Sequence, residues 1–243
     1  MAIIDEFIKK TREFYEELKV QDRHRYRSWE HCYAQFYETR QNPEKANVNN
    51  LSLHLAFYLA SWGMYRGSSF LLQYDYTIHT SVVEEILKQK YDKLLGLECN
   101  ELNNEEICSL LDELNTKIKK IYNPFRSKVK KPKGKKDISN ILVSKILLGT
   151  LGCVPAYDRF FVKAVTNIDE DTKKKVTTRN YNIASLQKLI KFYEDEEHQE
   201  KLEKLRSEFL IKYEFDGEEK TLDYPQMKLL DMGFWKIGFD LSK

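Results

Sequence analysis

The stretch Asp137–Phe161, DISNILVSKILLGTLGCVPAYDRFF, decides the predicted fold. Asp137 is a suitable helix N-cap because its side-chain oxygen can accept hydrogen bonds from the free backbone N–H groups of a first helical turn. The apolar residues that follow leave almost no solvent-exposed face, so we expect a buried central helix over residues 137–152. Gly152 ends this helix.

A short turn with polar and aromatic residues follows this helix. It places an ionisable pair, Asp158 and Arg159, between Tyr157 and Phe160. A charged side chain that is buried with apolar residues needs a partner of opposite charge. The turn is therefore one of the places where the sequence predicts binding or chemistry.

A second candidate region begins in the apolar helix expected over Val48–Trp62. His54, Tyr58 and Trp62 are spaced four residues apart, so they lie on one face of this helix. Polar residues continue into the segment after it. The predicted ligand-binding residues of the two regions together are Tyr58, Trp62, Tyr65, Arg66, Ser69, Tyr157 and Arg159.

Two interpretations of these regions stay open. In the first, Arg66 and Asp158 form a structural ion pair that locks two helices together, and structural networks of this kind outnumber catalytic ones. In the second, they line a polar pocket, with His54 and Asp158 as the best candidate catalytic pair. Neither residue lies in a recognisable catalytic motif, so the sequence leaves enzymatic activity open.

The rest of the chain predicts an all-α fold, a compact multi-helix bundle around the central helix. Only 9 of the 243 residues are Gly and 5 are Pro, and apolar residues recur with the helical period. Helices are expected over residues 2–22, 26–39, 48–62, 77–95, 103–121, 137–152, 182–211 and 225–233. A hairpin around Asp216-Gly217 is the alternative to a helix that continues through residues 209–213.

The segment Arg126–Lys136, RSKVKKPKGKK, divides the chain into an N-terminal part, 1–125, and a C-terminal part, 137–243, which we expect to pack as one globular unit. Seven of its eleven residues are basic. The segment is either a solvated connector or a site for nucleic-acid phosphates. The residues expected to contact phosphate are Lys128, Lys130, Lys131, Lys133, Lys135 and Lys136.

Composition excludes several classes of protein. The 40 basic and 38 acidic residues give a net charge of +2, so nucleic-acid affinity would require local clusters of charge. The four cysteines show no metal-binding spacing, and no metal site or cofactor is predicted. The sequence has no secretory signal and no run of about 18 apolar residues, so we expect a cytoplasmic protein without a membrane partner.

The central helix and the turn after it resemble the helix-hairpin-helix DNA glycosylase superfamily over Gly134–Phe161. In that family a glycine-rich hairpin and a lysine-bearing helix precede a Pro-x-Asp segment, and here Lys145, Pro155 and Asp158 take the corresponding places. The resemblance implies a catalytic role for Asp158 and phosphate contacts upstream of the helix. Pro155 and Asp158 are one residue further apart than in the family, and the paired glycines and a cysteine cluster are missing.

The segments HLAFYLASWGMYRGSSFLL and ILLGTLGCVPAYDRFF are also similar to parts of uncharacterised bacterial helical proteins. The sequence thus leaves three functional hypotheses. The first is a nucleic-acid-associated protein with the basic segment on phosphate and the Asp158 turn at a cleft. The second is an enzyme or binder of a small polar ligand at a pocket of His54, Arg66 and Asp158. The third is a helical protein-interaction module without a pocket. The oligomeric state stays open.

Overall fold

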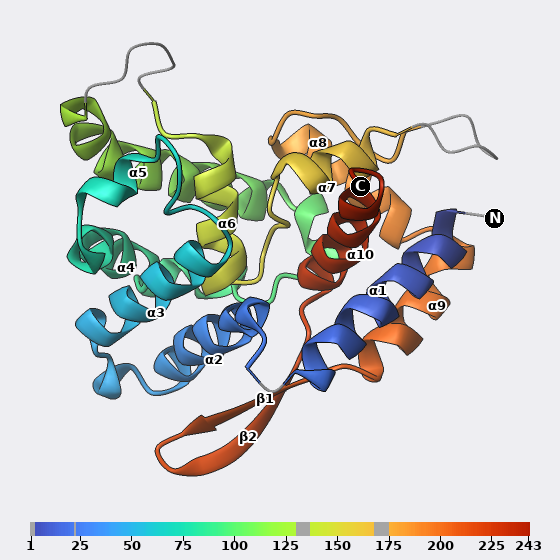
Figure 1. Cartoon of the computed structure of the whole chain (residues 1–243), viewed down its shortest axis with the longest axis horizontal. Helices are drawn as coiled ribbons and strands as arrows, with labels where there is room; N and C mark the ends of the chain where they lie inside the picture. Colours follow the sequence, from blue (N-terminus) through green and yellow to red (C-terminus); the bar gives the residue numbers. More distant parts are fainter. Residues whose placement is uncertain (1–2, 22, 130–136, 168–174) are drawn as a thin grey trace.

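The computed structural model describes residues 3–21, 23–129, 137–167 and 175–243. It confirms the all-α prediction, because helices make up most of the described chain and only one small sheet accompanies them (Figure 1). The α-helices are α1 (Ile3–Val20), α2 (Ser28–Gln41), α3 (Val48–Ser61), α4 (Thr80–Ile86), α5 (Glu105–Lys128), α6 (Asn140–Thr150), α7 (Arg159–Val165), α8 (Ile183–Tyr193), α9 (Glu196–Ser207) and α10 (Gln226–Asp240). Short 3-10 helices are η1 (Arg25–Arg27), η2 (Pro43–Lys45), η3 (Phe70–Gln73), η4 (Tyr76–His79), η5 (Gln89–Leu94) and η6 (Cys99–Asn103).

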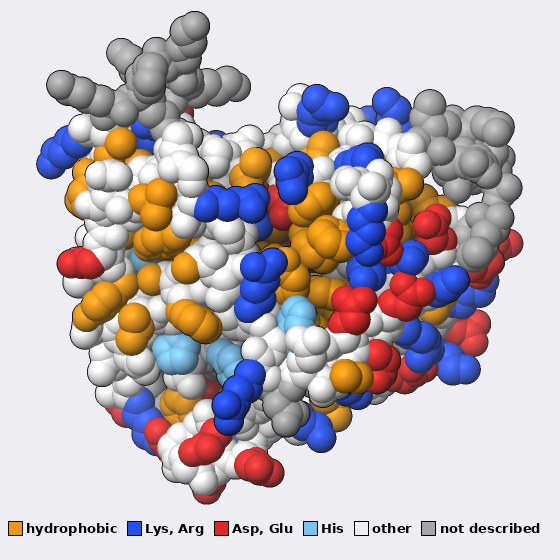
Figure 2. Space-filling view, viewed as in Figure 1, with side chains coloured by type: hydrophobic (Ala, Val, Ile, Leu, Met, Phe, Trp, Pro, Cys, Tyr) orange, Lys and Arg blue, Asp and Glu red, His pale blue; other side chains and the backbone are white. Residues whose placement is uncertain are grey.

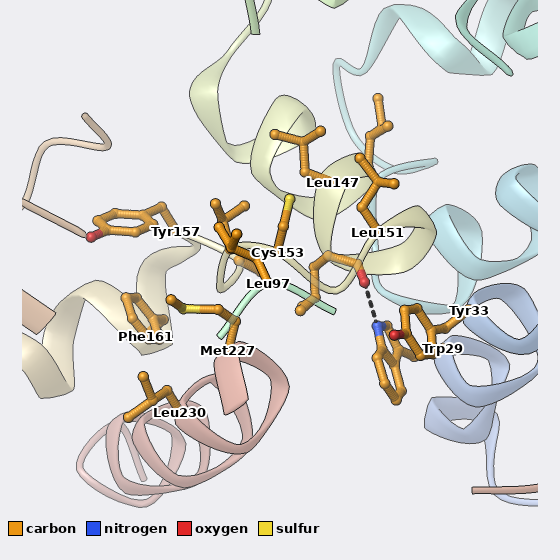
Figure 3. Packing of buried hydrophobic residues seen from close by; sticks show 14 of the residues in the cluster. Trp29, Tyr33, Leu97, Leu147, Leu151, Cys153, Tyr157, Phe161, Met227 and Leu230 are labelled. Atoms are coloured by element: carbon orange, nitrogen blue, oxygen red, sulfur yellow. Dashed lines mark hydrogen bonds between the residues drawn. The ribbon is translucent and has the colours of Figure 1, made fainter. Parts of the chain in front are cut away.

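Helix α6 is the buried central helix, as predicted. It packs against α2, α3 and α5 and lies in the middle of the molecule in Figure 1. Its N-cap is Ser139, whose Oγ accepts a hydrogen bond from Leu142 N at 3.3 Å, rather than the predicted Asp137. On its buried side, the indole N–H of Trp29 donates to the Leu148 carbonyl at 2.9 Å (Figure 3). Gly152 ends the segment with φ +64°, a backbone conformation that favours glycine.

Helix α10 is longer than predicted, because it continues through Gly233 and ends at Asp240. A Cβ atom on Gly233 would lie 2.3 Å from Phe7 Cε2, and one on Gly238 would lie 1.9 Å from the Phe160 carbonyl oxygen. These two glycines therefore let α10 approach α1 on one side and α7 on the other. The cost of glycine within a helix is offset by the close packing that it permits.

Three other predicted boundaries were wrong. The helix expected over residues 182–211 is two helices, α8 and α9, because Asp195 caps the start of α9. Residues 77–95 form only the short α4 between η4 and η5. Helix α5 does not end at residue 121, as predicted, but continues through Pro124 to Lys128. A proline near the end of a helix removes a single backbone donor, and the hydrogen bonds around it can persist.

The hairpin alternative is confirmed. Strands β1 (Leu210–Phe215) and β2 (Glu218–Asp223) pair antiparallel, with Phe215 opposite Glu218. Asp216 and Gly217 form the two-residue turn with φ +54° and +80°. Positive φ at both positions matches the right-handed twist of the strands. The hairpin projects from the helical body beside α2 (Figure 1).

The predicted basic linker differs from the structure in its first part. Arg126 and Lys128 belong to the last turn of α5. The remaining lysines of the segment, Lys130, Lys131, Lys133, Lys135 and Lys136, lie outside the described residues. Across the described ranges, none of the helices combines the length and the apolar character that crossing a membrane requires.

Candidate functional site

Asp158 lies at the junction of the turn and α7, where it has two structural roles. One carboxylate oxygen accepts hydrogen bonds from Phe160 N at 3.0 Å and Phe161 N at 3.2 Å, so Asp158 is the N-cap of α7. The other oxygen lies 3.1 Å from the amine of Lys145 in α6. Asp158 therefore fixes the start of α7 and its distance from α6 at the same time.

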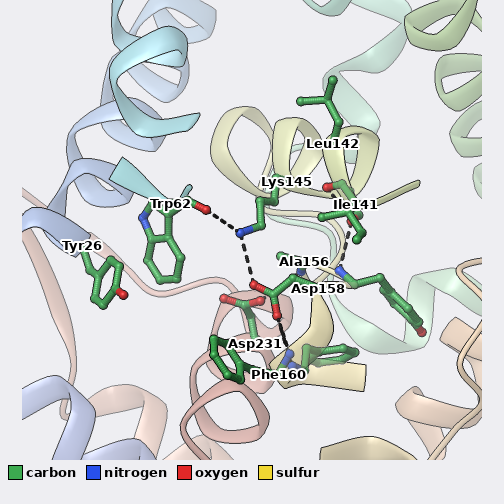
Figure 4. A network of polar contacts seen from close by, with 12 residues as sticks. Tyr26, Trp62, Ile141, Leu142, Lys145, Ala156, Asp158, Phe160 and Asp231 are labelled. Carbon is green, nitrogen blue, oxygen red and sulfur yellow. Dashed lines mark hydrogen bonds and ion pairs between the residues drawn. The ribbon is translucent and has the colours of Figure 1, made fainter. Parts of the chain in front are cut away.

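Lys145 is a charged residue in the middle of the apolar central helix. Its side chain is only 4% exposed, and its amine also donates to the Trp62 carbonyl at 2.9 Å, at the end of α3 (Figure 4). A buried ammonium needs both a counter-charge and hydrogen-bond acceptors. Lys145 obtains the counter-charge from α7 and an acceptor from α3, so it joins three segments.

A second buried ion pair lies next to the first. Lys228 and Asp231 of α10 are 2.8 Å apart and nearly inaccessible, and Asp231 also accepts from Ala156 N at 3.0 Å. The Lys228 amine lies 4.9 Å from the ring centre of Trp29 and 4.7 Å from that of Trp62. Burial raises the pKa of Asp231, and the nearby charge of Asp158 adds to this effect, whereas Lys228 opposes it. We call Lys145, Asp158, Lys228 and Asp231 the buried charge cluster.

The predicted pair of Arg66 and Asp158 is wrong, because Lys145 is the partner of Asp158. The Arg66 guanidinium is exposed and forms no ion pair with any carboxylate of the described residues. Sequence reasoning missed Lys145 as the partner because it read the helix as apolar. The signal was present, since a lysine on an otherwise buried helix requires a buried counter-charge.

His54 is also not where the pocket hypothesis places it. It is half-buried near His31 of α2, and burial lowers the pKa of both imidazoles below the ordinary value. Tyr58, one turn further along α3, is fully buried, and its ring occupies the space where a Cβ of Gly149 would lie. His54 lines neither of the hollows that Asp158 lines, and among the described residues no hydrogen bond or ion pair joins the predicted catalytic pair.

The structure does bring other predicted residues together around a hollow of about 440 Å³, which we call the Trp62 pocket. It lies between the end of α3, the first turns of α6 and the start of α7. Five predicted site residues line it, namely Trp62, Tyr65, Arg66, Asp158 and Arg159. Further lining residues, which sequence reasoning missed, are Arg25, Tyr26, Lys145, Phe160 and Trp235.

Two more hollows adjoin the Trp62 pocket at the N-terminus of α6. Ser139 lines all three, and the neighbours have volumes of about 780 and 390 Å³. The larger neighbour contains Tyr157, and the smaller one contains Ser69. We call the three hollows together the α6 groove. Figure 2 shows this face, with Lys and Arg side chains gathered around a hollow that has an apolar interior.

The charges of the α6 groove are strongly unbalanced. Its acidic residues are Asp137 and Asp158. Its basic residues are Arg25, Arg66, Lys119, Arg126, Lys145, Arg159, Lys163 and Arg179, which makes eight cations against two carboxylates. This group of cations cannot be recognised from the sequence, because its members come from segments that are far apart in the chain.

Tyr65 links the lining of the Trp62 pocket to a buried histidine. Its hydroxyl lies 2.7 Å from His79 Nε2, and His79 Nδ1 in turn contacts the hydroxyl of the fully buried Tyr122. Burial lowers the pKa of His79 to about 3, so the imidazole is neutral at physiological pH. Burial also raises the pKa of Tyr65 to about 12, which keeps its hydroxyl protonated.

Within the described ranges, no group of three or more His, Cys, Asp or Glu side chains is placed to hold a metal ion. The comparisons with known proteins add no relative. No family model matches the sequence, and no curated protein or solved structure is significantly similar to it.

Proposed function

We propose that the protein binds the phosphate backbone of nucleic acid along the α6 groove. The observation that carries this proposal is the charge of the groove, where eight cations and only two carboxylates line adjoining hollows. The whole chain, in contrast, has a net charge of only +2. Lysine and arginine that neutralise phosphates release counterions, and this release drives binding without regard to sequence.

The pairing of the groove cations supports this proposal. Lys145 is paired with Asp158, and Lys163 donates to the backbone carbonyl of Leu241 at the end of α10. In contrast, Arg66, Arg159 and Arg179 are exposed and form no ion pair among the residues that the structure describes. Their guanidinium groups therefore need not give up an internal partner when they contact a phosphate.

The described residues on both sides of the lysine-rich segment 130–136 lie at the same surface. The described chain stops at Val129, just after the groove residue Arg126, and resumes at Asp137, which itself lines the groove. Five lysines lie between these points. The proposal also implies that the protein is located with nucleic acid. The four cysteines form no disulfide, which is consistent with the cytoplasmic location predicted from the sequence.

The proposal is tested by fluorescence anisotropy with a labelled mixed-sequence duplex and a matching single strand at about 50 and 200 mM salt. We expect affinity to fall with a log–log slope no steeper than roughly −5, since the buried Lys145 and Arg126 do not reach a phosphate and six of the eight groove cations remain. The variant Arg66→Gln/Arg159→Gln/Arg179→Gln should flatten this slope by about 2 to 3. Base sequence should have little effect, because phosphate contacts carry no base information.

A matched control variant changes three exposed lysines that do not line the groove, Lys9→Gln/Lys204→Gln/Lys212→Gln. It removes the same net charge as the groove variant. Because it leaves the groove unchanged, it should keep the wild-type slope. Equal losses in both variants would assign the affinity to net charge and not to the groove. No binding by the wild type at about 50 mM salt would reject the proposal. The variant Lys130→Gln/Lys131→Gln/Lys135→Gln/Lys136→Gln measures what the basic segment adds.

A further inference from the structure

The Trp62 pocket differs from the rest of the α6 groove, because five aromatic side chains line it. Its volume of about 440 Å³ falls within the range of small-molecule sites, roughly 300 to 1,000 Å³. The ring of Trp62 packs against those of Tyr26 and Trp235, and Trp235 packs against Phe160. A groove that only followed a phosphate backbone would not need such a pocket.

The charged groups of the pocket leave a net positive charge at its opening. Lys145 and Asp158 neutralise each other, so three arginines remain. The Arg25 guanidinium is held 4.6 Å above the Tyr26 ring centre and donates to its hydroxyl at 2.7 Å. The Arg159 guanidinium is held 4.3 Å above the Phe160 ring centre. Arg66 completes the set from the turn after α3.

Two buried polar groups beside the pocket have unused hydrogen-bonding capacity. Trp62 is 8% exposed, and its Nε1–H is inaccessible to solvent and has no acceptor among the described residues, so it is the rest of the ring that faces the pocket. A buried donor without a partner is uncommon in native proteins and calls for an explanation. Lys145 lines the same pocket, and two of its three N–H groups are accounted for by the Trp62 carbonyl and Asp158.

From these observations we propose that the Trp62 pocket binds a phosphate monoester. A monoester carries about −1.5 to −2 charge at neutral pH and several acceptor oxygens, which suits the three arginines of the pocket. An internal phosphodiester carries only one charge and is flanked by sugars on both sides, so it suits a pocket with three arginines less well. The organic part of the ligand would then lie against the aromatic lining.

Two sources of ligand share this chemistry, the terminal phosphate of a nucleic-acid strand and a free nucleoside monophosphate. The strand-end form rests on the proposed function above, whereas the free-nucleotide form does not. The experiment compares a 5′-phosphorylated oligonucleotide, a 3′-phosphorylated one and the unphosphorylated strand of identical sequence, and it adds AMP, adenosine and inorganic phosphate as separate probes.

We expect a terminal phosphate, or the phosphate of AMP relative to adenosine, to strengthen binding by roughly tenfold or more, as typical hydrogen bonds to charged groups do. This gain should disappear in Arg66→Gln and in Arg159→Gln, each of which removes one guanidinium from the lining of the pocket. The Trp62 indole cross-peak in a ¹H–¹⁵N spectrum should shift on addition of AMP. Arg66 and Arg159 are both exposed, so the two variants test the proposal without disturbing the core.

The outcomes separate this proposal from the proposed function. AMP binding that needs Arg66, without oligonucleotide binding, would keep the pocket and reject the nucleic-acid groove. Oligonucleotide binding that ignores terminal phosphates, together with no response to AMP or inorganic phosphate, would keep the groove and overturn the pocket proposal. Equal binding of AMP and adenosine would also overturn it, because the phosphate would then contribute nothing.

Discussion

The buried charge cluster and the exposed arginines of the α6 groove lie beside each other and use charge in opposite ways. In the cluster, each lysine has a carboxylate within about 3 Å, and the four side chains are 1 to 13% exposed. In the groove, Arg66, Arg159 and Arg179 have no carboxylate partner among the described residues. A charge that is paired inside the protein is committed to the fold, whereas an unpaired one on a concave surface is available to a ligand.

The comparison predicts its largest effect inside the cluster. Asp231→Ala would leave the ammonium of Lys228 buried without a counter-charge and Ala156 N without its acceptor. We expect the free energy of unfolding at pH 7 to fall by about 3 to 5 kcal/mol. Urea denaturation followed by circular dichroism measures this loss.

The matched control removes both charges, as Lys228→Met/Asp231→Leu. Replacing a whole buried ion pair by apolar residues is often neutral or stabilising, so most of the loss should be recovered. If the double variant were as unstable as Asp231→Ala, the shape of the pair and the Ala156 hydrogen bond would matter more than its charge. If Asp231→Ala cost less than about 1 kcal/mol, Lys228 would have another way to be solvated, and the contrast between cluster and groove would be wrong.

A smaller effect concerns pH, which acts on buried titratable groups and not on arginines. The pKa of His79 is lowered to about 3 in the folded protein from an ordinary value of 6.5. Between these values the unfolded chain binds a proton that the folded chain does not. The contribution of neutral His79 to the free energy of unfolding is therefore fully present above pH 6.5. It is lost as the pH falls toward 3, by about 1.4 kcal/mol per pH unit.

At pH 5 this amounts to about 2 kcal/mol relative to pH 7. His79→Gln keeps a polar side chain between Tyr65 and Tyr122 but does not titrate in this range. We expect the variant to be less stable at pH 7 and to show a shallower loss between pH 7 and pH 5. Parallel curves for the two proteins would mean that His79 becomes protonated without unfolding the region around it.

The sequence allowed the scaffold of this site to be predicted better than its charges. The buried helix over residues 137–152 was identifiable because its apolar residues extend around the whole helix, and α6 is that helix. The end of α10 was not, because Gly233 reads as a helix stop until its packing against Phe7 is known. A glycine that ends a helix and one that admits a neighbouring helix look the same in a single sequence.

The site residues also divide into those that the sequence predicted and those that only the packing of the structure shows. Trp62, Arg66 and Arg159 were predicted from the two polar turns, and the structure places them around one pocket. Arg25 and Arg179 were missed because nothing local distinguishes them from other surface arginines. Their position depends on how distant segments pack, and with 40 basic residues in the chain the spacing of charges alone cannot show which of them meet.

The smallest expected effect is on the groove side of the comparison, where stability should hardly change. Exposed side chains without an ion pair contribute little to folding, so Arg66→Gln and Arg179→Gln should each change the free energy of unfolding by less than about 0.5 kcal/mol. Arg159→Gln should cost slightly more, because its guanidinium packs over the Phe160 ring.

Denaturation at two salt concentrations adds a sharper criterion. Mutual repulsion among the groove cations is screened by salt, so the wild type should gain stability relative to the triple variant as salt increases. A loss above about 2 kcal/mol in the triple variant would show that these arginines hold the fold together, and the groove would then belong with the buried cluster as a structural use of charge.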